Sequence, residues 1–113
     1  MRKKIFLAMF LSAFLLNAHA AKSLELSYDS ETAALSVKVL HRVSNQDKHF
    51  IKTISVHAGA ELLAEKTYER QETAEAQEEI FLFIDQPLKK GAAVTVTAVC
   101  SISGKKSADL KWK

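Results

Sequence analysis

The chain has 113 residues, one cysteine and a formal net charge of +3 at neutral pH. The excess positive charge comes from Arg2, Lys3 and Lys4, because no acidic residue precedes residue 21 and the rest of the chain holds equal numbers of basic and acidic side chains. A nucleic-acid-binding surface needs surplus cations to displace counterions from phosphate, so this class of partner is not expected. A single cysteine also excludes a disulfide within the chain.

Residues 1–20 have the pattern of a secretory signal. Three basic residues precede an apolar run from Ile5 to Leu16, and Ala18-His19-Ala20 supplies an A-x-A cleavage site. The run is too short to cross a membrane, which takes roughly 20 apolar residues, and no later segment is longer. The sequence therefore predicts a signal peptide over residues 1–20, a periplasmic or secreted domain over residues 21–113, and no membrane span in the mature chain.

Short alternating segments follow, and they are typical of β-strands. Leu24–Tyr28 predicts a short strand, and Leu35–His41 alternates apolar and polar side chains with a period of two. The next strand is expected from about Lys48 to Val56. In that strand Ile51 is expected on the opposite face from three other apolar residues, Phe50, Ile54 and Val56.

The segment from Glu61 to Glu79 allows two interpretations. Ala, Glu, Leu, Lys and Gln dominate it, and each of these residue types favours a helix. A helix would, however, stack Glu61, Glu65 and Glu69 four residues apart, and its apolar residues would form no continuous stripe. We therefore expect a strand over Glu61–Tyr68 and then a solvated acidic loop.

Three more strands are predicted in the last third of the chain. Ile80–Ile84 is apolar on both faces, as is typical of a central strand. A longer strand follows within residues 92–103 and has one apolar face, made of Val94, Val96, Ala98, Cys100 and Ile102. The last strand is expected over Ser107–Trp112, with Trp112 in the core. About seven short strands separated by turns predict an all-β fold, an immunoglobulin-like antiparallel β-sandwich without that fold's disulfide.

Four groups of the mature chain could carry chemistry: His41, His49, His57 and Cys100. The sequence has no glycine-rich phosphate loop, no C-x-x-C and no H-E-x-x-H motif. A cysteine hydrolase would need a histidine and an orienting group beside the thiol, and nothing in the sequence indicates such a pairing. Thiolate and imidazole together suit iron, zinc or copper. Because His41 ends one predicted strand and His49 begins the next, both can meet Cys100 at one end of the sandwich, whereas His57 is expected in a turn at the opposite end.

Four segments between about Leu35 and Trp112 carry a further pattern. They are His41, Lys48–Val56 (KHFIKTISV), Ala58–Leu63 (AGAELL) and Val94–Gly104 (VTVTAVCSISG). Together they resemble the iron domain of superoxide reductases, the desulfoferrodoxin and neelaredoxin family. The resemblance implies an immunoglobulin-like sandwich in which four imidazoles and an axial cysteine thiolate hold a ferrous ion that reduces superoxide to peroxide. By position, it implies that His41, His49 and Cys100 are metal ligands and that iron is the cofactor.

The chain departs from the family pattern at the site itself. Ser103 stands where the closing C-N-x-H-G motif has its histidine, Arg42 stands where the family has a proline, and nothing between Ala21 and Val39 matches the E-K-H-V-P motif. Two of the five expected ligands are therefore missing, and a hydroxyl is a poor substitute for imidazole on iron. Superoxide reductase activity is accordingly not expected.

Simpler interpretations stand beside the metal site. Cys100 shares a face with Val96 and Ala98, and free cysteine is among the most often buried residue types, so it can be an inert core thiol. An exposed thiol would instead allow a disulfide to a second chain. The sequence favours a non-catalytic interaction module with a degenerate iron site, which binds a periplasmic protein partner through its sandwich edges or its acidic loop. The alternative is a metal-binding redox protein that uses His41, His49 and Cys100.

Overall fold

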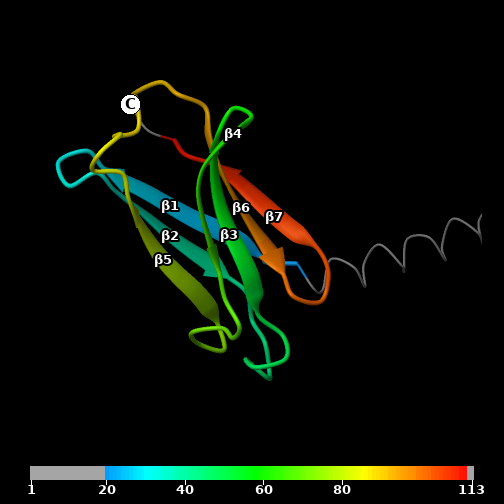
Figure 1. Ribbon diagram of the computed structural model, residues 1–113. Helices are drawn as coiled ribbons and strands as arrows, with labels where there is room; N and C mark the ends of the chain where they lie inside the picture. Colours follow the sequence, from blue (N-terminus) through cyan, green and yellow to red (C-terminus); the bar gives the residue numbers. More distant parts are fainter. Residues whose placement is uncertain (1–19, 112–113) are drawn as a thin grey trace, which may run out of the picture.

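The computed structural model describes residues 20–111, which form seven strands in two antiparallel sheets (Figure 1). The strands are β1 (Ser23–Asp29), β2 (Ala34–Leu40), β3 (Ile51–Ala58), β4 (Glu61–Thr67), β5 (Ala76–Leu82), β6 (Val94–Cys100) and β7 (Lys105–Asp109). One sheet has the order β1-β2-β5 and the other the order β4-β3-β6-β7. This is an immunoglobulin-like β-sandwich in which the fourth strand joins the sheet of β3, β6 and β7. The expected fold class is confirmed.

The core lies between the sheets and follows the alternation of β2 and β6. Six inward side chains of these strands are at most 2% exposed: Leu35, Val37 and Val39 in β2, and Val94, Val96 and Ala98 in β6. Full burial of a Val, Leu or Ile side chain stabilises a fold by about 1.5–3 kcal/mol. The period-two pattern of the sequence therefore supplies the packing that holds the two sheets together without a disulfide.

The strand β3 begins at Ile51, rather than at Lys48, and contains an irregularity near its start. Its register against β6 shifts between Ile51 and Thr53, so that Ile51 and Ile54 are both fully buried. An extra residue in one strand breaks the alternation of faces. The prediction that Ile51 lies on the face opposite Ile54 is therefore wrong. The strand also continues through His57 to Ala58, so His57 is a strand residue and not a turn residue.

The strand β5 is an edge strand, and the prediction of a central strand over Ile80–Ile84 is wrong. In the described residues it pairs only with β2. Ile80, Leu82 and Ile84 are 59, 62 and 67% exposed, whereas Phe81 between them is buried. Only the face that carries Phe81 is covered. The other face is apolar as well, but it is exposed to solvent. The strand also starts earlier, at Ala76, within the stretch expected to be a loop.

Some predictions fall at the borders of the described part of the chain. The signal peptide expected over residues 1–20 lies outside it except for Ala20, and so does Trp112. The strand β6 ends at Cys100, which leaves Ile102 exposed beyond it. The last strand covers Lys105–Asp109 instead of Ser107–Trp112. Between residues 20 and 111 there is no helix with the length and apolar character needed to cross a bilayer.

Candidate metal centre

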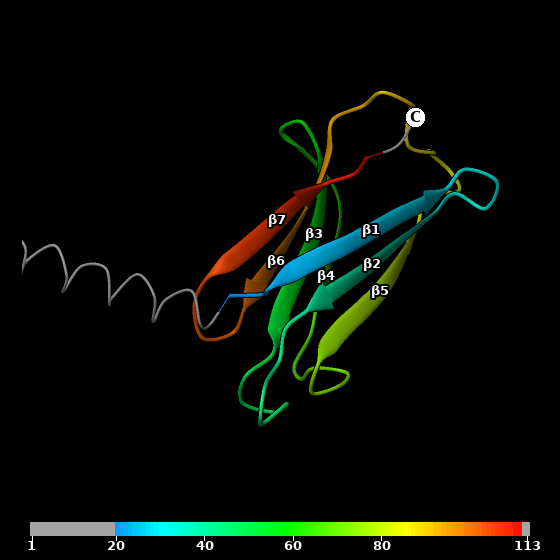
Figure 2. The same cartoon turned by 180° about the vertical axis from the view of Figure 1, so that it is seen from behind.

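Three connections meet at one end of the sandwich: the β2–β3 loop, the β4–β5 loop and the β6–β7 turn. Figures 1 and 2 show the first two side by side at the lower end of the molecule. The register pairs Ile51 at the start of β3 with Cys100 at the end of β6. Next to this pair, the amide of Ser101 donates to the carbonyl oxygen of Phe50 at 2.8 Å, and the amide of Phe50 donates to Oγ of Ser101 at 3.1 Å. The antiparallel topology thus brings together loops that lie far apart in the sequence.

His41, His49 and Cys100 meet at this end. Each offers one ligand atom, and these three atoms lie within 4.8 Å of one another. The two imidazole rings are arranged edge to face, with their centroids 4.7 Å apart. Nitrogen and sulfur donors around a tetrahedral zinc ion lie roughly 3.3–3.8 Å apart, so a contraction of about 1 Å would bring this group to ligand distance. The cluster predicted from the sequence is therefore present, and it could hold a metal ion.

The cluster is largely shielded from solvent. His41 is 3% exposed and Cys100 is 4% exposed, while His49 is half-buried. Cys100 continues the inward face of β6, as the core-thiol interpretation expects, but its neighbours include two imidazoles rather than only aliphatic side chains. Its burial places the thiol out of reach of a second chain, so the hypothesis of an intermolecular disulfide has no support from the fold.

The side chain of Gln71 orients His41. Gln71 is fully buried, and its Oε1 accepts hydrogen bonds from Nδ1 of His41 at 2.7 Å and from the amide of Ile51 at 3.2 Å. Its Nε2 donates to the carbonyl oxygens of His41 at 2.6 Å and of Thr73 at 2.9 Å. Because those carbonyls can only accept, the atom that faces them is the amide nitrogen of Gln71, and the atom that faces His41 is its oxygen. An amide oxygen can only accept, so Nδ1 of His41 must carry a proton. In the neutral imidazole with this tautomer, Nε2 is the nitrogen that binds metal ions.

The loop that carries Gln71 is fastened to the loop that carries His49. Nε2 of Gln46 donates to the carbonyl oxygens of Gln71 and Glu72, at 2.9 and 3.2 Å, and the amide of Gln71 donates back to the carbonyl oxygen of Gln46 at 3.1 Å. An exposed ion pair between Arg70 and Asp47, 2.8 Å long, joins the same two loops. The two loops therefore hold each other in place at the cluster.

Sequence reasoning missed Gln71, which it placed in a solvated acidic loop. No pattern in residues 69–79 separates this amide from its glutamate neighbours, because its burial depends on contacts with a distant loop. Among residues 20–111, the cluster takes in no further His, Cys, Asp or Glu, so His57 is not part of it. His57 pairs with Thr95 toward the other end of β3, in agreement with the expectation that it is not a ligand.

Tyr68 begins the β4–β5 loop, which also carries Gln71, but its side chain stabilises the fold rather than the cluster. Its hydroxyl donates to Oε1 of Glu79 at 2.7 Å. Burial, with additional contributions from the hydrogen bond and the negative charge of Glu79, raises the pKa of Tyr68 well above its ordinary value. This contact ties the end of β4 to β5, which lies in the opposite sheet.

Comparisons of the chain with protein-family models, with curated proteins and with solved structures find no match. The resemblance to the superoxide reductase family therefore stays a prediction, and the case for a metal centre depends on the His41–His49–Cys100 cluster itself.

Proposed function

We propose that the protein is an exported metal-binding domain whose ion is held by His41, His49 and Cys100. One observation carries this proposal: His41 and His49 of the β2–β3 loop and Cys100 at the end of β6 place their ligand atoms within 4.8 Å of one another at a shielded end of the sandwich. Two imidazole nitrogens and one thiolate suit zinc, copper or iron rather than calcium or magnesium. The geometry favours this alternative over the non-catalytic module that the sequence alone favours.

The surroundings of His41 support the same proposal. Metal-bound histidines usually donate their other ring N–H to a carbonyl, a carboxylate or water, which fixes the ring and its tautomer. Nδ1 of His41 makes this type of bond to Oε1 of Gln71 at 2.7 Å. This bond gives Nδ1 the role of donor to Gln71, so Nε2 is the ring nitrogen that would bind the ion.

The five-ligand iron site that the resemblance implies does not fit these residues. Within residues 20–111 the cluster offers three ligands, and the position expected to supply a further imidazole is Ser103. We therefore propose binding of an ion, and no superoxide reduction.

The test is elemental analysis of the exported protein, stripped of metal and then offered zinc, ferrous iron or cuprous copper without oxygen. We expect about one ion per chain, and we expect Cys100→Ala to lose it. His57→Ala is the matched control, because it removes an imidazole outside the cluster and should retain the ion. Circular dichroism verifies that both variants are folded. Metal well below one ion per chain, or an amount that Cys100→Ala leaves unchanged, would contradict the proposal.

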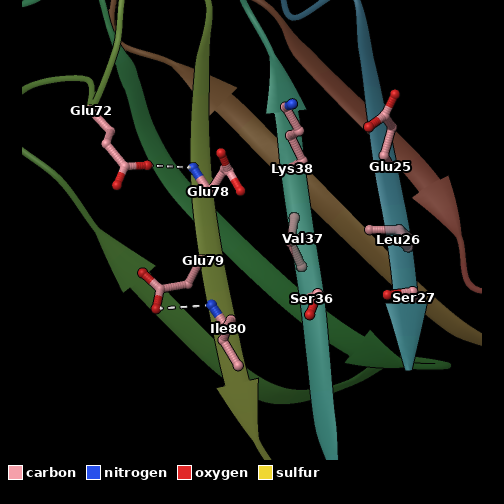
Figure 3. Close-up of a pocket in the computed structure, with 10 residues that line it drawn as sticks. All are labelled: Glu25, Leu26, Ser27, Ser36, Val37, Lys38, Glu72, Glu78, Glu79 and Ile80. Atoms are coloured by element: carbon pink, nitrogen blue, oxygen red, sulfur yellow. Dashed lines mark hydrogen bonds between the residues drawn. The ribbon is translucent and has the colours of Figure 1, made fainter. Parts of the chain in front are cut away.

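The interaction module keeps one observation in its favour, which is the outer face of the β1-β2-β5 sheet. Ile80 and Leu82 are exposed there, and Ile80 lines a shallow groove of about 530 Å³ (Figure 3). Four carboxylates and one ammonium group line the groove: Glu25, Glu72, Glu78, Glu79 and Lys38. A partner for this face would present apolar and basic side chains. Loss of a co-purifying exported protein in Ile80→Lys, but not in the exposed control Ile102→Lys, would support this second function.

A further inference from the structure

Within residues 20–111, the cluster holds three donors of the His, Cys, Asp and Glu types. In the described part of the chain no carboxylate and no other histidine joins His41, His49 and Cys100. Oε1 of Gln71, which is buried beside His41, already accepts two hydrogen bonds and lies on the Nδ1 side of the ring. Zinc in structural sites is almost always four-coordinate, whereas cuprous copper is stable with three soft or borderline ligands.

The charge of the ligand set points in the same direction. Two neutral imidazoles and one thiolate carry a single negative charge. A divalent ion would leave one net positive charge in a place where His41 and Cys100 are almost completely buried, while a monovalent ion would leave none. Neighbours in the chain do not supply the missing anion, because Arg42 follows His41 and Lys48 precedes His49, and both are exposed cations.

The partner of His41 completes the argument. A carboxylate bonded to a metal-binding histidine would add negative charge and favour a divalent ion. Gln71 holds the same position with a neutral amide, and its two N–H groups are engaged with the carbonyl oxygens of His41 and Thr73. The outer contacts of the site therefore orient the ring without adding charge.

We infer that the His41–His49–Cys100 site selects the cuprous ion in three-coordination, an inference that rests on the proposed function. On binding, the thiol of Cys100 releases its proton to water and its sulfur becomes the soft ligand. Copper(I), one thiolate and two imidazoles then form a neutral unit that can stay buried at the end of the sandwich.

The test compares Cu(I) and Zn(II) on the exported protein without oxygen, each against a colorimetric chelator of known affinity. We expect one Cu(I) per chain, bound at least about a thousandfold more tightly than Zn(II), and X-ray absorption with two nitrogen ligands and one sulfur ligand. Gln71→Glu adds a charge beside His41 and should shift the Cu(I):Zn(II) preference toward zinc by about 10-fold or more. The control is Gln77→Glu, which alters another buried amide outside the cluster and should leave the ratio unchanged.

The outcomes separate this inference from the proposed function. Zinc bound as tightly as Cu(I), or copper with a fourth protein ligand, overturns the selection of Cu(I) but leaves a metal-binding domain. Failure to bind Cu(I), Zn(II) or ferrous iron overturns both. Should Gln71→Glu not fold, the comparison of the two ions on the wild-type protein decides the question by itself.

Discussion

Replacement of Gln71 by Leu tests the buried hydrogen bonds that position His41. The change keeps most of the side-chain volume and removes four hydrogen bonds, to Nδ1 and the carbonyl oxygen of His41, the amide of Ile51 and the carbonyl oxygen of Thr73. A buried polar group left without its partner costs about 1–3 kcal/mol. The bond to Thr73 is only partly buried, so water can replace it. Three penalties, reduced by relaxation of the loop, lower the free energy of unfolding by about 3–5 kcal/mol.

The measurement is equilibrium unfolding in urea of the metal-free protein, with the midpoint and the slope fitted together. A domain of this kind has a stability of about 5–15 kcal/mol, so Gln71→Leu should remain folded in the absence of urea. Gln77→Leu is the matched control: it also removes a buried amide, but only two hydrogen bonds, to the amide of Glu72 at 2.8 Å and to the carbonyl oxygen of Glu78 at 3.2 Å. A loss below about 1 kcal/mol in Gln71→Leu, or one no larger than in the control, would refute the reasoning.

Two further changes probe the loops around the site. Because the pKa of Tyr68 is raised, the folded state keeps the phenol proton to a higher pH than the unfolded state does. The contribution of Tyr68 to stability is therefore complete below about pH 10 and is lost as the pH rises further. Tyr68→Phe should show a shallower loss of stability above that pH in urea unfolding, and equal slopes for the two proteins would contradict the assignment. Gly104 has a φ of +90°, a conformation that strains a residue with a Cβ atom, and the turn is closed by a hydrogen bond of 3.0 Å from the amide of Cys100 to the carbonyl oxygen of Gly104. Gly104→Ala should therefore lower stability by about 1–2 kcal/mol in thermal unfolding. Ser103→Ala, next to it, should change stability by less than about 0.5 kcal/mol, and a loss as large as that of Gly104→Ala would speak against backbone strain as the cause.

The fold could be predicted from the sequence wherever one face of a strand is apolar and the other polar. In β2 and β6 the alternation indicated both the strand and its inward face, and these strands form the centre of the core. The same rule failed at Ile51. The register of β3 against β6 shifts just after this residue, so Ile51 and Ile54 are both buried in the core. It also failed at Ile80, because hydrophobicity alone does not tell an edge strand with exposed apolar residues from a covered one.

Of the candidate site, only the histidine and cysteine residues could be predicted from the sequence. Histidine and cysteine are rare in the chain, so their positions at predicted strand ends were informative. Gln71 has no such signal, since glutamine is ordinary in an acidic loop and becomes an orienting group only when that loop folds against Gln46. Local pattern thus indicates the ligands, while the groups that orient them depend on contacts between distant parts of the chain.

The position of the cluster between the two sheets has a consequence for unfolding. His41 follows β2 of one sheet and Cys100 ends β6 of the other, so an ion held by both would cross-link the sandwich. A cross-link that closes a loop of about 60 residues removes chain entropy from the unfolded state worth on the order of 4 kcal/mol. Small secreted domains commonly obtain this restraint from a disulfide. In a chain with one cysteine, a reversible metal cross-link would supply it instead, and stability would rise and fall with the concentration of the available ion.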